Sequence, residues 1–137
     1  MGILPASADF PGAHPYYRHA LADLREARGL LNAGSYARGV DAIEDVAIDA
    51  IDRAIGDIKA AGVDDGKPVG FGVPPDPGID RRGRIHRALQ ALRDAHRDTD
   101  REEQNPNALG LQHRATRDID IAIRHGKRAL HDAEHPH

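Results

Sequence analysis

An internal repeat constrains this chain more than any other feature of its sequence. When the chain is compared with itself at an offset of 68 residues, two separate stretches match at the same offset. One offset that serves two stretches indicates a duplicated unit. The matching residues are Ala20, Leu21, Leu24, Arg25 and Ala27 with Ala88, Leu89, Leu92, Arg93 and Ala95, and Ala47, Ile51, Asp52, Ala54 and Ile55 with Ala115, Ile119, Asp120, Ala122 and Ile123.

Four stretches carry apolar residues at intervals of three and four, which is the pattern of an amphipathic helix. They run from Pro15 to Leu31, from Asp41 to just before Gly62, from Asp80 to just before Asn105, and from Asn107 through Leu130. Asn32-Ala33-Gly34 is expected to end the first of them. No stretch alternates with period two for the length of a strand. We therefore expect an all-α fold, a four-helix bundle made of two repeated helical hairpins.

The 137 residues suit one domain. Residues 1–14 read as a flexible N-terminal arm, and residues 15–137 as a single bundle domain with hairpins at 15–61 and 80–133. Residues 62–79 (GVDDGKPVGFGVPPDPGI) form a long Gly/Pro-rich connection between the hairpins. Its length allows it to cross the whole bundle, which we favour, although a loose loop between up-and-down neighbours is the alternative.

Composition excludes several functions. The chain has no cysteine, so disulfides, thiolate metal sites and thiol nucleophiles are absent. A net charge of −3 argues against a nucleic-acid partner, and no apolar run is long enough for a membrane span. No secretory signal is evident, but one could have been removed ahead of Gly2, so an exported and a cytoplasmic location both stay open.

Arg25, Asp52, Arg93 and Asp120 are the charged residues that the repeat keeps. Residues 25 and 52 have their midpoint near 38, and residues 93 and 120 near 106, both inside expected turns. Each arginine can therefore lie level with the aspartate across its hairpin. We expect two structural salt bridges; the alternative is a pair of symmetry-related carboxylates in a central site.

Arginines at every third position open the third expected helix. Arg81, Arg84 and Arg87 would form a basic stripe near a helix N-terminus, where backbone N–H groups also favour anions. His86 lies beside the stripe, and His96 extends the inward row of the same helix at the position that Arg28 holds in the first repeat. These five residues are the candidate ligand-binding set, against the alternative of a solvated face and a packed histidine.

Nine histidines are many for a chain of this length. His131 and His135 are four residues apart near the end of the last helix, where they could hold a divalent transition metal. The alternative is an exposed helix end that binds metal only adventitiously. A ferritin-type di-iron site is not expected, because the glutamates do not fall at inward positions of matching height; these are Glu26, Glu44, Glu102, Glu103 and Glu134.

Three stretches, HPYYRHALADLREAR, EDVAIDAIDRAIGDIKAAGVDDGK and GRIHRALQALRDAH, resemble a group of small, uncharacterised bacterial four-helix-bundle proteins. The resemblance covers most of residues 14–130. It implies a four-helix fold and an exported protein, and it carries no diagnostic catalytic motif.

No nucleophile elbow or phosphate-binding loop occurs, and Ser7 and Ser35 are the only serines. We therefore expect a non-catalytic binding protein that carries a metal ion or a small anionic ligand. A structural or adaptor protein acting through protein contacts is the alternative, and an enzyme that pairs His96 with Asp52 or Asp120 comes third. A homodimer, with Ile121 as a contact, is also expected from the thin core.

Overall fold

The computed structural model describes residues 15–38, 42–101 and 109–135, and the expected N-terminal arm lies outside them. The described residues form four helices: α2 (Pro15–Arg38), α3 (Ala42–Ala60), α4 (Arg81–Arg101) and α5 (Leu109–Glu134). The described residues include no strand. The predicted all-α, four-helix fold class is confirmed.

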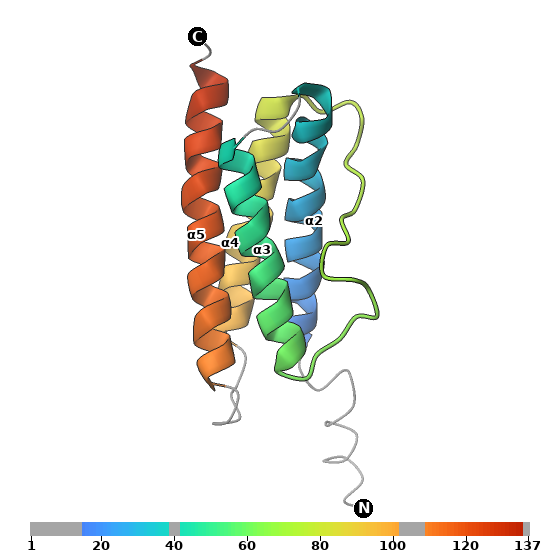
Figure 1. The fold of residues 1–137 in the computed structure, drawn as a ribbon, viewed down its shortest axis with the longest axis vertical. Helices are drawn as coiled ribbons and strands as arrows, with labels where there is room; N and C mark the ends of the chain where they lie inside the picture. Colours follow the sequence, from blue (N-terminus) through green and yellow to red (C-terminus); the bar gives the residue numbers. More distant parts are fainter. Residues whose placement is uncertain (1–14, 39–41, 102–108, 136–137) are drawn as a thin grey trace, which may run out of the picture.

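Each helix packs against two others, so the bundle has four sides and two diagonals. Helix α2 packs against α3 and α4, and α5 packs against the same two helices. Figure 1 shows the segment between α3 and α4 running beside α2 from one end of the bundle to the other. Helices α3 and α4 therefore point in the same direction and lie diagonally opposite each other.

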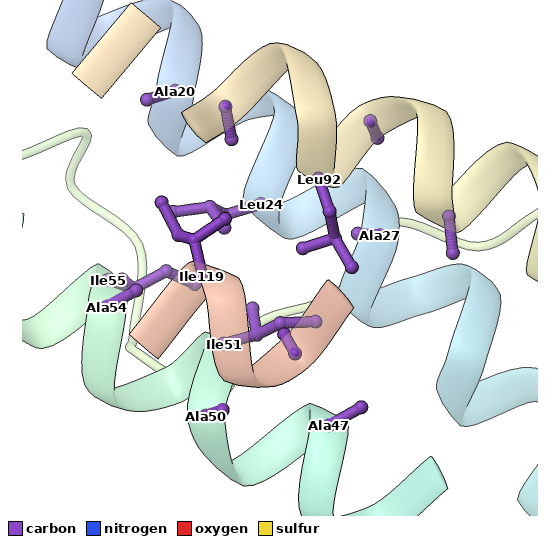
Figure 2. Close-up of a cluster of buried hydrophobic side chains, with 14 of the residues drawn as sticks. Ala20, Leu24, Ala27, Ala47, Ala50, Ile51, Ala54, Ile55, Leu92 and Ile119 are labelled. Atoms are coloured by element: carbon purple, nitrogen blue, oxygen red, sulfur yellow. The ribbon is translucent and has the colours of Figure 1, made fainter. Parts of the chain in front are cut away.

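Small and branched aliphatic side chains build the core. Figure 2 shows the residues of all four helices meeting there, among them Leu24 of α2, Ile51 of α3, Leu92 of α4 and Ile119 of α5, each with 0% of its surface exposed. Buried alanines on every helix allow the backbones to approach closely. Most apolar positions that are equivalent in the repeat are buried in both hairpins, although Ile55 is fully buried and its counterpart Ile123 is only partly buried. The duplication of the hairpin stays a prediction from the sequence.

Helix α2 is longer than the sequence predicted. It continues through Asn32-Ala33-Gly34 to Arg38, so the expectation that these three residues end the helix is wrong. A glycine inside a helix costs only about 1 kcal/mol, and no proline follows that would block the next turn. Helix α3 does end before Gly62, whose φ of 107° lies in the left-handed region that favours glycine.

Arg25 of α2 holds the connection against the bundle. Its guanidinium bonds both carboxylate oxygens of Asp65, with Nη2 to Oδ1 at 2.8 Å, and it donates to the carbonyl oxygens of Pro68 at 2.7 Å and Lys67 at 3.1 Å. Only 1% of Arg25 is exposed. Its hydrogen bond holds the pKa of Asp65 down at about 2, so the pair stays charged at any ordinary pH.

The side where α2 meets α4 carries a group of acidic side chains. The pKa of the Asp23 carboxyl is raised to about 6, first by burial and then by the nearby charges of Asp94, Asp98 and Glu26, while His19 acts in the opposite direction. Asp98 itself is only 8% exposed. The packing of α2 on α4 is therefore opposed by like charges when all these carboxyls are ionised.

No helix among the described residues is both long and apolar enough to span a membrane.

Replacing Arg25 by Ala tests how far the fold depends on this side chain. Asp65 and several carbonyl groups would lose their donor, and we expect the free energy of unfolding to fall by about 3–5 kcal/mol in urea titrations. The control is Arg93→Ala at the equivalent position of the repeat, where the side chain is exposed; a change within about 0.5 kcal/mol is expected there. Equal losses for the two variants would contradict this assignment.

Asp23 gives stability a defined pH dependence. Its pKa is 3.8 in the unfolded chain and about 6 in the fold, so the proton binds the folded state more tightly. The contribution is fully present below pH of about 4 and is lost as pH rises through about 6. We expect Asp23→Asn to stabilise the protein by about 1 kcal/mol at neutral pH, a value reduced by solvent screening, and to have little effect near pH 4.

Urea unfolding at several pH values measures this difference. Asp49→Asn, on the exposed face of α3, is the control and is expected to follow the wild-type pH profile. If the free energies of unfolding of Asp23→Asn and wild type differ by the same amount at every pH, Asp23 does not titrate as described.

Candidate ligand groove between α2 and the connection

Residues Val73, Pro74 and Pro75 of the connection form a ridge that passes over α2. The ridge touches the helix at Gly29, where a Cβ atom would lie 1.8 Å from the carbonyl oxygen of Val73. A Cβ at Gly72 would likewise lie 3.2 Å from the Cα of Gly29. Glycine is therefore needed at position 29 for the close approach of the two backbones.

A cavity of about 490 Å³ opens on one side of this ridge, and we name it the Arg28 cavity. Two elements line it: Arg28, Gly29 and Asn32 come from α2, and Gly70, Phe71, Gly72, Val73, Pro74 and Pro75 come from the connection. Its size is in the range of small-molecule sites, which are commonly apolar with a few placed polar groups.

Arg28 supplies the charge in this cavity. Asp52 of α3 accepts from its Nε at 2.7 Å and from its Nη2 at 3.3 Å, which sets the plane of the guanidinium. Nη1 has no hydrogen-bond partner within the described part of the chain, and the side chain is 17% exposed. Gly70 and Gly72 pass close to the guanidinium, and a Cβ at either would contact it.

Phe71 forms an apolar wall of the same cavity. Its side chain is 40% exposed, and two cations lie over its ring: the guanidinium of Arg25 at 5.9 Å and the ammonium of Lys67 at 5.2 Å. These contacts orient the ring. The cavity thus combines a fixed cation with an aromatic surface.

The two predicted salt bridges form with different partners. Asp52 pairs with Arg28 and not with Arg25, because Arg25 is taken by Asp65 of the connection. The predicted partner was therefore wrong by one helical turn.

Asp120 pairs in the corresponding way with His96, whose Nε2 lies 3.1 Å from Oδ1, while Arg93 is exposed and makes no ion pair in the described segments. Arg28 and His96 are 68 residues apart, as are Asp52 and Asp120, so the two pairs occupy equivalent positions in the two hairpins. The Asp–His pair considered for catalysis exists, but neither of its members lines the Arg28 cavity.

The arginine stripe of α4 is divided among three surroundings. Arg81 lies 3.3 Å from Glu44 and 3.9 Å from Asp132, and Arg84 donates to the carbonyl of Ile79 at 3.1 Å. Arg87 is exposed and points toward the connection, where it lines a second cavity. The structure therefore does not bring the three together as one anion site.

Glu44 of α3 is buried, with only 2% of its surface exposed. Its pairing with Arg81 allows the carboxylate to be buried.

Near the C-terminal end of α5, two of the remaining histidines contact each other. His131 and His135 stack with ring centroids 4.3 Å apart, and Nδ1 of His135 lies 2.9 Å from the carbonyl oxygen of His131. His86 lies 3.7 Å from Glu134. Among the residues that the structure describes, no group of three or more metal-binding side chains is found. Ile121, the expected dimer contact, packs against the core of its own chain.

The residues of the Arg28 cavity were not singled out from the sequence as a site. Arg28 was noted only as the position equivalent to His96 in the repeat, and Phe71 only as one residue of the Gly/Pro-rich connection. The alternation of Val69-Gly70-Phe71-Gly72-Val73 was the available signal, since glycines between apolar residues allow close backbone approach.

Two glycines in helices give opposite predictions. Gly29→Ala would force the new methyl group into Val73, and we expect a loss of about 1–3 kcal/mol in unfolding free energy with displacement of the ridge. Gly56→Ala in α3 meets no atom within 4 Å and should stabilise the protein by about 0.5–1 kcal/mol. Thermal unfolding of both variants measures the contrast, and a stabilising Gly29→Ala would show that the ridge does not rest on this position.

Comparison of the chain with known protein families, with curated proteins and with solved structures finds no match in any of the three.

Proposed function

We propose that this protein is a non-catalytic binding protein and that the Arg28 cavity holds a small ligand with a carboxylate and an apolar body. The observation that carries the proposal is the position of Arg28: Asp52 holds two of its nitrogens, and Nη1 is left toward a cavity with an apolar wall.

The geometry of Arg28 favours a carboxylate over a diffuse negative charge. A guanidinium whose plane is set in advance loses little freedom when it binds, and its N–H groups match the oxygens of a carboxylate. Asp52 offsets part of the positive charge, so a ligand with one negative charge suits the cavity better than one with several. Phe71, Val73 and Pro74 offer the surface for its apolar part.

The lining of the cavity supports binding without chemistry. It contains arginine, asparagine, glycine, phenylalanine, valine and proline, and it lacks the side chains that serve as nucleophiles or as general bases near neutral pH. The same lining lacks carboxylate and imidazole ligands, which favours an organic anion over a metal ion.

Calorimetric titration with benzoate tests the proposal, with benzyl alcohol as the uncharged comparison. We expect benzoate to bind the wild-type protein and Arg28→Gln to weaken it by about tenfold or more, because a charged hydrogen bond is lost. Arg93→Gln removes the same charge from an exposed site outside the cavity and should leave binding unchanged.

Equal binding of benzoate and benzyl alcohol, or equal binding by wild type and Arg28→Gln, would overturn the proposal. Circular dichroism of each variant establishes that the helices are intact.

A further inference from the structure

A second cavity, of about 340 Å³, lies beside the same ridge. We name it the Arg87 cavity. Three elements contribute to it: Glu26 and Leu30 come from α2, Val73, Pro74, Pro75 and Asp76 from the connection, and Arg87 from α4. Only Val73, Pro74 and Pro75 are shared with the Arg28 cavity, so the charged residues of the two sites are different.

Opposite charges line this cavity without pairing with each other. Glu26 and Arg87 both face it, yet neither has an ion-pair partner within 4.0 Å among the residues that the structure describes. Asp76 is oriented by the backbone N–H of Gly78, which donates to its Oδ1 at 3.0 Å. The cavity therefore has carboxylates from α2 and the connection, and a guanidinium from α4.

The apolar part of the cavity is equally well defined. Leu30 is only 3% exposed and forms part of the lining from α2, while Val73 is 41% exposed and stands beside it on the ridge. Pro74 and Pro75 are rigid and carry no side-chain donor. A ligand that fills this space must bring an apolar group together with its charges.

From this arrangement we infer that the Arg87 cavity binds a zwitterion, an α-amino acid with an apolar side chain. Its ammonium group lies at Glu26 and Asp76, its carboxylate at Arg87, and its side chain on Leu30 and Val73. A free amino acid carries an ammonium and a carboxylate group close together, so one molecule can bind the two carboxylates and the guanidinium of the cavity at once. Because the amino acid has no net charge, its binding leaves the net charge of the site unchanged. The inference goes beyond the proposed function, because no residue that carries a charge is common to the two cavities.

An ion with a single charge fits this cavity less well. An amine would leave Arg87 without a partner, and a carboxylate would leave Glu26 and Asp76 without one, so each would forfeit part of the charge-assisted hydrogen bonding. The requirement for both charges separates this site from the Arg28 cavity, where a carboxylate and an apolar body are sufficient.

Calorimetric titration with L-leucine tests the inference. N-acetyl-L-leucine lacks the ammonium group and 3-methylbutylamine lacks the carboxylate, and we expect each to bind at least about tenfold more weakly than leucine. Glu26→Gln and Arg87→Gln should each weaken leucine binding by a similar factor. Asp49→Asn and Arg93→Gln, which alter exposed charges outside the cavity, are the matched controls.

Two results would overturn the inference: no binding of leucine up to about 10 mM, or binding that is equal for leucine and its two analogues. Unchanged leucine binding by Glu26→Gln and Arg87→Gln, with helicity intact, would also place the ligand elsewhere. Arg28→Gln is expected to keep leucine binding while it loses benzoate, so failure at one cavity is distinguishable from failure at the other.

Discussion

The buried guanidinium of Arg25 is the interaction on which the position of the connection against the bundle depends. A connection rich in glycine and proline has few apolar side chains to bury, and of those that follow α3 only Val63 is well covered, with 3% of its surface exposed. The connection is held instead by the bonds that Asp65, Lys67 and Pro68 accept from one side chain of α2. Without these bonds, few contacts would offset the conformational entropy that the connection loses when the ridge lies on α2.

Both cavities follow from the way in which the connection rests on α2. The backbone touches the helix at Gly29, where the absence of a side chain permits contact, and the ridge leaves a hollow beside it on each side. The core of the bundle, by contrast, is closely packed, and Ile51, Ala54 and Ile119 in it are fully buried. Both cavities therefore lie where a helix meets an irregular segment.

The partners of Asp52 and Asp120 show what residue spacing can and cannot predict about side-chain contacts. Asp52 and Asp120 each pair one turn away from the arginine that the spacing predicted, with Arg28 and His96. A long side chain can reach a partner one turn above or below its own level, so spacing alone leaves the choice open. Arg25 binds Asp65 instead, which lies forty residues further along the chain. Helical periodicity relates residues within one helix, so it could not predict this contact.

The sequence by itself determined the four helices and the apolar face of each, because helical periodicity and burial depend on local spacing. Only the tertiary structure decided the path of the connection along α2, the partners of Arg25 and Arg28, and the two cavities beside Val73. The alternation at Gly70, Phe71 and Gly72 does not say which helix surface they meet, and their positions depend on that surface. The Arg28 cavity exists only where the connection lies on α2, and the Arg87 cavity also needs Arg87 of α4, so neither could be read from the pattern of a single helix.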